Sequence, residues 1–150
     1  MTEVVAGRVA EATDVLVEAF ADYPVMRWVL GAPDDGYPAR LRTLVWFFVQ
    51  ARALRSEPVL GIADGAGLAA AALVSYPGRR ENPPELYELR DRTWRDLGDS
   101  ARERYEAFSA ACAPLIVDGP HIHLNMIGVR SSARGRGLGR QLIERVHAMS

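Results

Sequence analysis

Hydrophobic residues in the first third of the chain recur every three or four positions, the spacing of helices with one buried side. A first strand is expected at Val4 to Val9, followed by a helix that Thr13 caps and that Pro24 ends or bends. The apolar side of this helix consists of Leu16, Ala19, Phe20 and Tyr23. A short helical piece then stops at Gly31, and a longer helix covers about residues 38–54. This region is therefore predicted to be mainly helical.

The middle of the chain changes to runs that are typical of strands. Residues 58–63 and 68–76 are two such runs, and the sequence Asp-Gly-Ala-Gly at 64–67 joins them as a hairpin turn. The second run is rich in alanine and has helical propensity, but the turn before it favours a strand. Two helices follow, one with Asn82 as its expected cap and one with a capping box at Ser100. Their mixed charges at helical spacing indicate solvated faces.

A last strand is expected at residues 121–129 and a last helix from about Gly137 to the end. The apolar residues that this helix should bury are Leu138, Leu142, Ile143 and Val146. The predicted order is β-α-α-β-β-α-α-β-α, a mixed α/β or α+β layer architecture. The 150 residues suffice for one core, so a single domain over 1–150 is expected.

Composition narrows the function classes. A net charge of −1 gives no global electrostatic reason to bind nucleic acid or an anionic membrane, and neither partner is expected. Cys112 is the single cysteine, which excludes a disulfide scaffold and fits a reducing compartment. No apolar run approaches the roughly 20 residues of a membrane span, and the N-terminus lacks the pattern of a signal peptide. A cytoplasmic protein is predicted.

The segment between the last strand and the last helix carries the clearest chemical signal. Glycines alternate with other residues there, so the backbone can turn sharply and approach a ligand closely. The N–H groups of residues 135–140 would be the unpaired donors of a helix start, directed at an anion. Three arginines add positive charge that suits a diphosphate. The residues expected to bind it are Arg134, Gly135, Arg136, Gly137, Leu138, Gly139 and Arg140.

Two familiar phosphate-binding motifs do not fit this segment. A Walker loop requires Gly-Lys-Ser/Thr, and all 18 basic residues of the chain are arginine. A dinucleotide fingerprint reads G-x-G-x-x-G after the first strand, with an acid about 20 residues further on. Here the spacing is G-x-G-x-G, it follows the fourth strand, and no such acid follows. Nucleotide hydrolysis and a Rossmann enzyme are both disfavoured.

Residues 121–129, His-Ile-His-Leu-Asn-Met-Ile-Gly-Val, followed by 134–139, Arg-Gly-Arg-Gly-Leu-Gly, resemble the acyl-CoA signature of the GNAT superfamily of N-acetyltransferases. The match covers the Arg/Gln-x-x-Gly-x-Gly/Ala positions, and the order of the other elements is also similar. The resemblance implies a mainly antiparallel sheet flanked by helices, and acetyl-CoA as co-substrate with no metal. It also implies that the backbone around Ile127 and Val129 pairs with the pantetheine arm, and that an amine, in a small molecule or a peptide, accepts the acetyl group.

His123 is the candidate general base. It lies six residues before Val129, where several members of the family carry a glutamate or histidine in this role. An imidazole with a pKa near 6.5 can take a proton from an amine at neutral pH. Strand alternation places residues 121, 123, 125, 127 and 129 on one face. A structural histidine in the sheet is the alternative, and His121 is expected to be solvated. No third residue completes a metal site with this pair.

The family usually continues into a further strand and a helix that carries a tyrosine acid, and nothing here corresponds to them. We therefore expect a domain that is incomplete at its C-terminus, with a last strand whose free edge can pair with a second copy in a homodimer. Direct acetyl transfer to a primary amine in a ternary complex is the leading hypothesis. The alternative is a GNAT-like module that binds acyl-CoA without turnover, with a regulatory or partner-complementing role. Four early aromatic residues are candidates to wall the amine site: Tyr23, Trp28, Tyr37 and Trp46.

Overall fold

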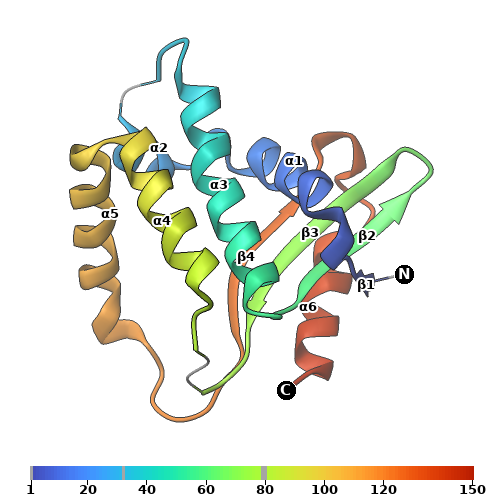
Figure 1. The fold of residues 1–150 in the computed structure, drawn as a ribbon. Helices are drawn as coiled ribbons and strands as arrows, with labels where there is room; N and C mark the ends of the chain where they lie inside the picture. Colours follow the sequence, from blue (N-terminus) through green and yellow to red (C-terminus); the bar gives the residue numbers. More distant parts are fainter. Residues whose placement is uncertain (1, 32, 79–80) are drawn as a thin grey trace.

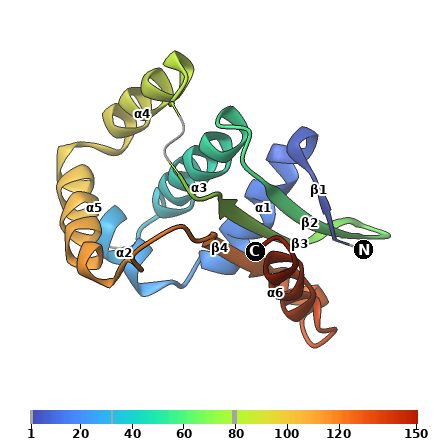
Figure 2. The same cartoon turned by 90° about the horizontal axis from the view of Figure 1, so that it is seen from below.

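The computed structural model describes residues 2–31, 33–78 and 81–150. Its four-stranded sheet has the order β1-β2-β3-β4, and all neighbouring strands are antiparallel. Helices α1 and α3 cover one face of the sheet and α6 covers the other, as Figures 1 and 2 show. The bounds are β1 Thr2–Val4, α1 Val9–Phe20, α2 Pro24–Leu30, α3 Tyr37–Leu54, β2 Val59–Asp64, β3 Gly67–Ser75, α4 Pro84–Leu97, α5 Asp99–Cys112, β4 His123–Val129 and α6 Leu138–Ala148. The α+β class with an antiparallel sheet is confirmed, with three early helices instead of two.

The N-terminal segment differs from its prediction. The strand ends at Val4, and a 3₁₀ turn at Ala6–Arg8 leads directly into α1. Because α1 starts at Val9, Thr13 lies within the helix and is not its cap. The Thr13 hydroxyl donates to the Val9 carbonyl at 2.8 Å, which satisfies the polar group at a fully buried position. The expected strand over Val4 to Val9 and the expected cap were therefore wrong.

The hairpin of β2 and β3 is confirmed and forms the centre of the molecule. Seven consecutive residues of β3, 68–74, are buried, because α1 and α3 cover one face of the strand and α6 the other. A strand covered on both faces needs no alternation of polar residues. The turn is stabilised by Asp64, whose carboxylate accepts from the Ala66 amide at 2.8 Å. The alanine-rich run is thus a strand, as the hairpin turn predicts, and not the helix that alanine favours.

Strand β4 contains a bulge at Asn125. Met126 pairs with Leu73 of β3, but the next pair along the ladder joins Leu124 to Val74. One residue of β4 is thus left without a partner, as in other bulges, and the alternation of its side chains restarts there. The regular alternation that the sequence suggested is interrupted at this point.

The bulge separates residues that were expected to share a face. Ile127 and Val129 pack with the apolar cluster beneath α6, whereas Met126 packs with the cluster beneath α1 and α3. His123 opens on the same side of the sheet as Met126. The single face over 121–129 was therefore wrong, because the inserted residue shifts the later side chains to the opposite face. The base candidate and the two strand residues lie on opposite sides of β4.

Helix α1 crosses β4 at Gly128, where only glycine fits. A Cβ atom placed on Gly128 would lie 2.6 Å from the Cβ of Ala19 and 3.2 Å from a methyl carbon of Leu16. The absence of a side chain thus lets the helix and the strand approach closely. This contact fixes α1 beside the strand that carries His123.

The starts of α4 and α5 and one residue of α6 differ from their predictions. Helix α4 follows Pro83 and α5 follows Gly98, and no side chain caps either helix, so the expected cap at Asn82 and the capping box at Ser100 were wrong. Gly98 separates the two helices as expected. In α6, Leu142 and Val146 are buried, but Ile143 is 42% exposed. Ile143 follows Leu142 directly and therefore points away from the sheet, since neighbouring residues on a helix face different directions.

Candidate active site

The segment that joins β4 to α6 forms a loop with the backbone that its glycines predict. Gly135 and Gly137 have φ angles of 80° and 75°, in the region that favours glycine. Gly137 directly precedes α6, and a Cβ atom at either glycine would meet nothing within 4 Å. The first N–H groups of α6 therefore open onto free space, with the positive end of the helix dipole behind them.

Glu18 of α1 fixes the start of this loop. Its carboxylate accepts from the amide of Ser131 at 3.1 Å, from the hydroxyl of Ser131, and from the Arg130 guanidinium at 3.2 Å. The Ser131 hydroxyl contributes most to a lowered pKa of Glu18. Since Glu18 stays ionised at neutral pH, α1 holds the loop at a defined position.

The loop arginines have different surroundings. Arg136 lies 3.6 Å from Asp64 of the hairpin, and Arg140 pairs with Glu144 one turn further along α6 at 2.9 Å. The Arg134 side chain is exposed and makes no ion pair with the residues that the structure describes. All three guanidinium groups lie on the surface, where an anionic ligand can reach them.

The main-chain groups of Ile127 and Val129 point toward the open edge of β4. Arg130 donates its N–H to the Ala69 carbonyl at 2.8 Å, so these two residues form a hydrogen-bonded pair of the ladder. Hydrogen-bonded and non-hydrogen-bonded pairs alternate along antiparallel strands. The register therefore makes Val129 and Ile127 members of non-hydrogen-bonded pairs, whose N–H and C=O groups point away from β3. Among the described strands, none lies beyond β4. Amides and carbonyls on this edge are available to a ligand, while the two side chains remain in the core.

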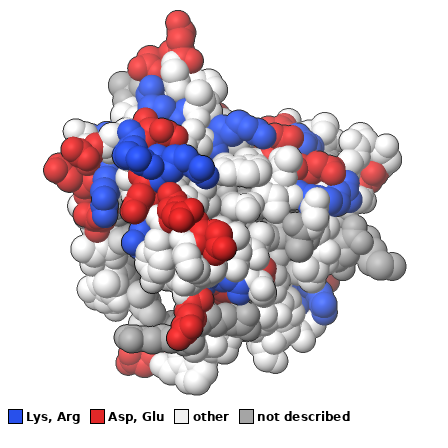
Figure 3. Space-filling model, viewed as in Figure 1, with Lys and Arg blue, Asp and Glu red and all other residues white. Residues whose placement is uncertain are grey.

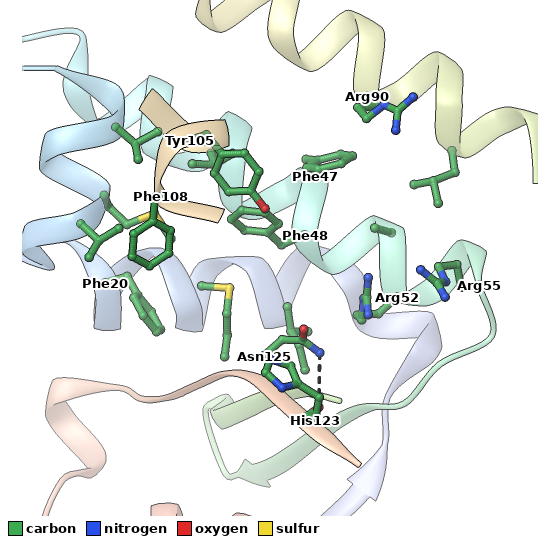
Figure 4. Close-up of a pocket in the computed structure, with 18 of the residues that line it drawn as sticks. Phe20, Phe47, Phe48, Arg52, Arg55, Arg90, Tyr105, Phe108, His123 and Asn125 are labelled. Atoms are coloured by element: carbon green, nitrogen blue, oxygen red, sulfur yellow. Dashed lines mark hydrogen bonds between the residues drawn. The ribbon is translucent and has the colours of Figure 1, made fainter. Parts of the chain in front are cut away.

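On the other side of β4, an open cavity of about 490 Å³ is lined by residues of the five helices α1 to α5 and of the sheet. Figure 4 shows aromatic rings along one part of its wall and three arginines at the other, with His123 and Asn125 below them. The aromatic residues come from α1, α3, α4, α5 and the residue before α2, and they are Phe20, Tyr23, Phe47, Phe48, Tyr87, Tyr105 and Phe108. Burial raises the pKa of the Tyr105 phenol, which therefore stays protonated. A cavity of this kind can hold a small molecule with an apolar part.

A polar network joins the end of α3 to β4 at the cavity floor. Glu57 has a buried side chain and pairs with Arg52 at 3.2 Å and Arg55 at 2.9 Å. Arg52 also donates to the Ser75 hydroxyl, which accepts from the Asn125 side chain at 2.8 Å. Burial lowers the pKa of Arg52, although not enough to discharge a guanidinium. Glu57 thus holds the side chains of Arg52 and Arg55 in place.

The structure distributes the predicted site residues over two places. His123 is exposed at the cavity, while residues 134–140 form the loop and the first residues of α6 beyond the opposite end of the same strand. His121 is half-buried and its Nδ1 lies 2.9 Å from the Gly119 carbonyl, so it is not simply solvated. Of the four early aromatic candidates only Tyr23 lines the cavity, since Tyr37 is in the core and the two tryptophans lie elsewhere on the surface.

Several cavity residues were not found by sequence reasoning. Arg90 and Tyr105 lie in the stretch that was interpreted as solvated helix faces, and Arg52, Arg55 and Phe108 had no signal of their own. The prediction of solvated faces was correct for most of α4 and α5. Figure 3 shows acidic and basic side chains interspersed on the surface over these two helices. The signal that could have found Tyr105 is its place among charged residues, since a large ring there favours a buried contact.

Residues 75–148 match the model of the acetyltransferase (GNAT) family. A crystal structure described as histone acetyltransferase HPA2 and related acetyltransferase, from Corynebacterium glutamicum, is 26% identical over 99% of this chain and 70% of its own, with a TM-score of 0.69. Arylalkylamine N-acetyltransferase 2 from Aedes aegypti is 18% identical over 99% and 69%, with a TM-score of 0.62, and shares the fold. Comparison with curated protein sequences gives no significant match.

Two further observations concern the residues that the structure describes. None of their helices has the length and apolar character needed to cross a membrane. No three of their histidine, cysteine, aspartate or glutamate side chains gather in a way that could hold a metal ion.

The strand, the glycine loop and the following helix lie within the matched segment, and the fold agrees over nearly the whole chain. Residues 75–148 thus carry a GNAT acetyltransferase domain, and the solved structures that share the fold of the chain are described as acetyltransferases.

Proposed function

We propose that this chain is an N-acetyltransferase that moves an acetyl group from acetyl-CoA to a primary amine by direct attack in a ternary complex. The observation that supports this most strongly is the arrangement along β4. The glycine loop follows one end of the strand, His123 begins the other, and the open-edge amides of Ile127 and Val129 lie between them. One strand thus connects a place for a diphosphate, a place for an extended arm and a base.

The chain's own groups fit acetyl-CoA, which when bound supplies the acetyl group as an activated thioester. The free N–H groups at the start of α6 and the exposed guanidinium of Arg134 would hold the diphosphate. The edge amides of Ile127 and Val129 would pair with the amide-rich arm as an added strand does. One of these N–H groups would also polarise the thioester carbonyl as charge develops on its oxygen. Two open glycines keep this approach free of side chains.

His123 would act on the other reactant. An amine reaches the protein protonated and must lose a proton before its lone pair can attack. The imidazole is exposed at the cavity floor and can accept that proton directly or through a water molecule. An amine as acceptor is also supported by the fold neighbour that is described as an arylalkylamine N-acetyltransferase.

The test is release of free CoA from acetyl-CoA in the presence of a panel of primary amines, together with thermal stabilisation by acetyl-CoA. We expect stabilisation and amine-dependent release. Stabilisation without release for any amine would instead support a module that binds acyl-CoA without turnover. Absence of stabilisation would contradict the assignment of the loop and the strand edge.

The predicted homodimer would use the same edge of β4 as the pantetheine arm. Both partners need the outward amides of Ile127 and Val129, so they exclude one another. Light scattering of the purified chain, with and without acetyl-CoA, tests this. A dimer that persists at saturating acetyl-CoA would show that its interface lies elsewhere.

A further inference from the structure

We infer that the acceptor is an apolar α-amino acid or a close analogue, in which the carbon that carries the amine also carries an anionic group and an apolar side chain. This inference rests on the proposed acetyl transfer and adds the chemical class of the amine. It is drawn from the charge of the cavity, the distribution of its rings and the position of His123 between the two.

The cavity wall is cationic at one end. Arg52, Arg55 and Arg90 line it, and none of the described residues that line it is acidic. Arg52 and Arg55 share one buried carboxylate, that of Glu57, beneath the wall. Glu57 itself does not line the cavity, so the side chains that the described residues present there include guanidinium groups and no carboxylate.

Arg90 is the guanidinium that is best placed to meet a ligand. It projects from α4 on the side that faces Arg52 and Arg55, as Figure 4 shows. Its guanidinium carbon lies 5.0 Å from the centroid of the Tyr87 ring. Arg90 makes no ion pair with the described residues and is exposed. A guanidinium fork in this setting can bind a carboxylate through two hydrogen bonds.

The opposite end of the cavity is apolar. The rings of Phe48 and Tyr105 lie 5.8 Å apart between centroids, and Trp94 packs behind Tyr105 at 5.2 Å. Phe20 and Phe108 lie on the same side in Figure 4, away from the three arginines. An apolar side chain placed here would lose contact with water and gain contact with several rings.

His123 lies where the two ends meet. It is the β-ladder partner of Ser75, and the Ser75 hydroxyl is the group that links Arg52 to Asn125. The cationic end therefore begins directly beside the proposed base. An amine held at His123 would have the arginines on one side and the rings on the other. An α-amino acid has this arrangement, because one carbon joins its nitrogen, its carboxylate and its side chain.

An amine without an anionic group fits this cavity less well. Its ammonium form would approach three guanidinium groups with no facing carboxylate, and like charges repel most where water is partly excluded. A carboxylate on the acceptor reduces this repulsion and gives the Arg90 guanidinium an anionic partner. The charge of the cavity thus distinguishes among amines that all fill the apolar end.

The first experiment compares kcat/KM for phenylalanine, phenylalanine amide and 2-phenylethylamine with the wild-type chain. The three share the ring and the amine, but only the first carries a negative charge. The amide has the less basic amine and is intrinsically the easier to deprotonate, so a preference for the acid must come from recognition. We expect the acid to exceed the amide by about tenfold or more, the ratio that one charged hydrogen-bonded contact gives. Equal or better use of the amide would overturn the inference.

The second experiment changes Arg90 to glutamine. The acid-to-amide ratio is expected to fall by about tenfold, mainly through KM for the acid, and Arg90→Lys should restore part of it. Arg95→Gln is the matched control, because Arg95 is on the same helix but lines a different depression. A ratio that is unchanged in Arg90→Gln, or that falls equally in Arg95→Gln, would contradict the assignment.

Failure of the proposed transfer can be recognised separately. If no amine is acetylated, calorimetry of phenylalanine and of its amide still compares their binding to the cavity without any turnover. Tighter binding of the acid that is lost in Arg90→Gln would support an anion site even in an inactive chain. Binding of neither compound, in a chain that acetylates other amines, would overturn the substrate class and leave acetyl transfer intact.

Discussion

The two ends of β4 are built in opposite ways. The loop after Val129 is one continuous segment that offers backbone N–H groups, and a single carboxylate, that of Glu18, holds its start. The cavity around His123 is assembled from side chains on five helices and two strands. A site made of main chain depends on a few local backbone angles, whereas a site made of side chains depends on how distant elements pack.

The family match divides the molecule along the same line. The matched segment, 75–148, includes the loop and all of β4, but α1, α2 and α3 lie outside it. Those helices carry Phe20, Phe48 and Arg52, which shape the cavity. We therefore expect substitutions in the loop to change acetyl-CoA binding for every acceptor, and substitutions in the cavity to change the choice of acceptor.

Replacement of His123 is the strongest test of this division between the loop and the cavity. We predict that His123→Ala lowers turnover near neutral pH by about 10²-fold or more, because the amine loses its proton acceptor. The affinity for acetyl-CoA should stay nearly unchanged, since the loop and the strand edge remain intact. Steady-state kinetics and calorimetry measure the two quantities.

His121→Ala is the matched control for that variant, because His121 is the neighbouring histidine and its ring contacts a backbone carbonyl instead of the cavity. It should keep most of the turnover. Equal losses in both variants, or identical acidic limbs of the pH–rate profiles of wild type and His123→Ala, would contradict the role of His123 and favour a structural histidine.

The second prediction concerns the loop. Gly137→Val should weaken acetyl-CoA binding by at least about tenfold, because a β-branched residue strains a backbone with φ near 75° and its side chain enters the space in front of α6. Thermal stabilisation by acetyl-CoA is the measurement.

Gly119→Val separates backbone strain from loss of the site. Gly119 has a φ of 83° and equally open surroundings, but it lies before β4. The two variants should lose similar stability without ligand, while only Gly137→Val should lose stabilisation by acetyl-CoA. If Gly119→Val loses it to the same extent, the loop assignment is wrong.

The same contrast explains what the sequence could reveal. Residues 134–139 carry a local pattern, so the turn, the helix start and the family could be predicted from a few neighbouring residues. Arg52 and Arg90 are ordinary helix arginines in sequence, and they come together only because α3 and α4 pack against each other. The bulge at Asn125 was also unpredictable, because a single inserted residue leaves no signal in the alternation of a strand that is partly buried on both faces.

A smaller effect is predicted for Glu18, the residue of α1 that contacts the start of the glycine loop. Glu18→Gln keeps the size of the side chain but removes the charge that Ser131 and Arg130 contact. Because this carboxylate is 37% exposed, we expect a loss of about 1 kcal/mol or less, which lowers Tm by about 2–4 °C in a domain of this size. Acetyl-CoA affinity should fall more than the affinity for the acceptor. An effect on the acceptor alone would contradict the proposed link from α1 to the loop.

The last prediction is the pH dependence of that contribution. Hydrogen bonds from Ser131 and the neighbouring Arg130 lower the folded-state pKa of Glu18 below its usual 4.5. The folded state therefore binds this proton less readily than the unfolded state, and the carboxylate stabilises the fold fully above about pH 4.5. As the pH falls below that value, the unfolded state takes up the proton first and the contribution is lost. The stability difference between wild type and Glu18→Gln should thus be constant from neutral pH down to about pH 5 and shrink at lower pH. Urea titrations of both proteins over this range measure it, and a difference that grows toward acid would mean that Glu18 does not hold the loop as an anion.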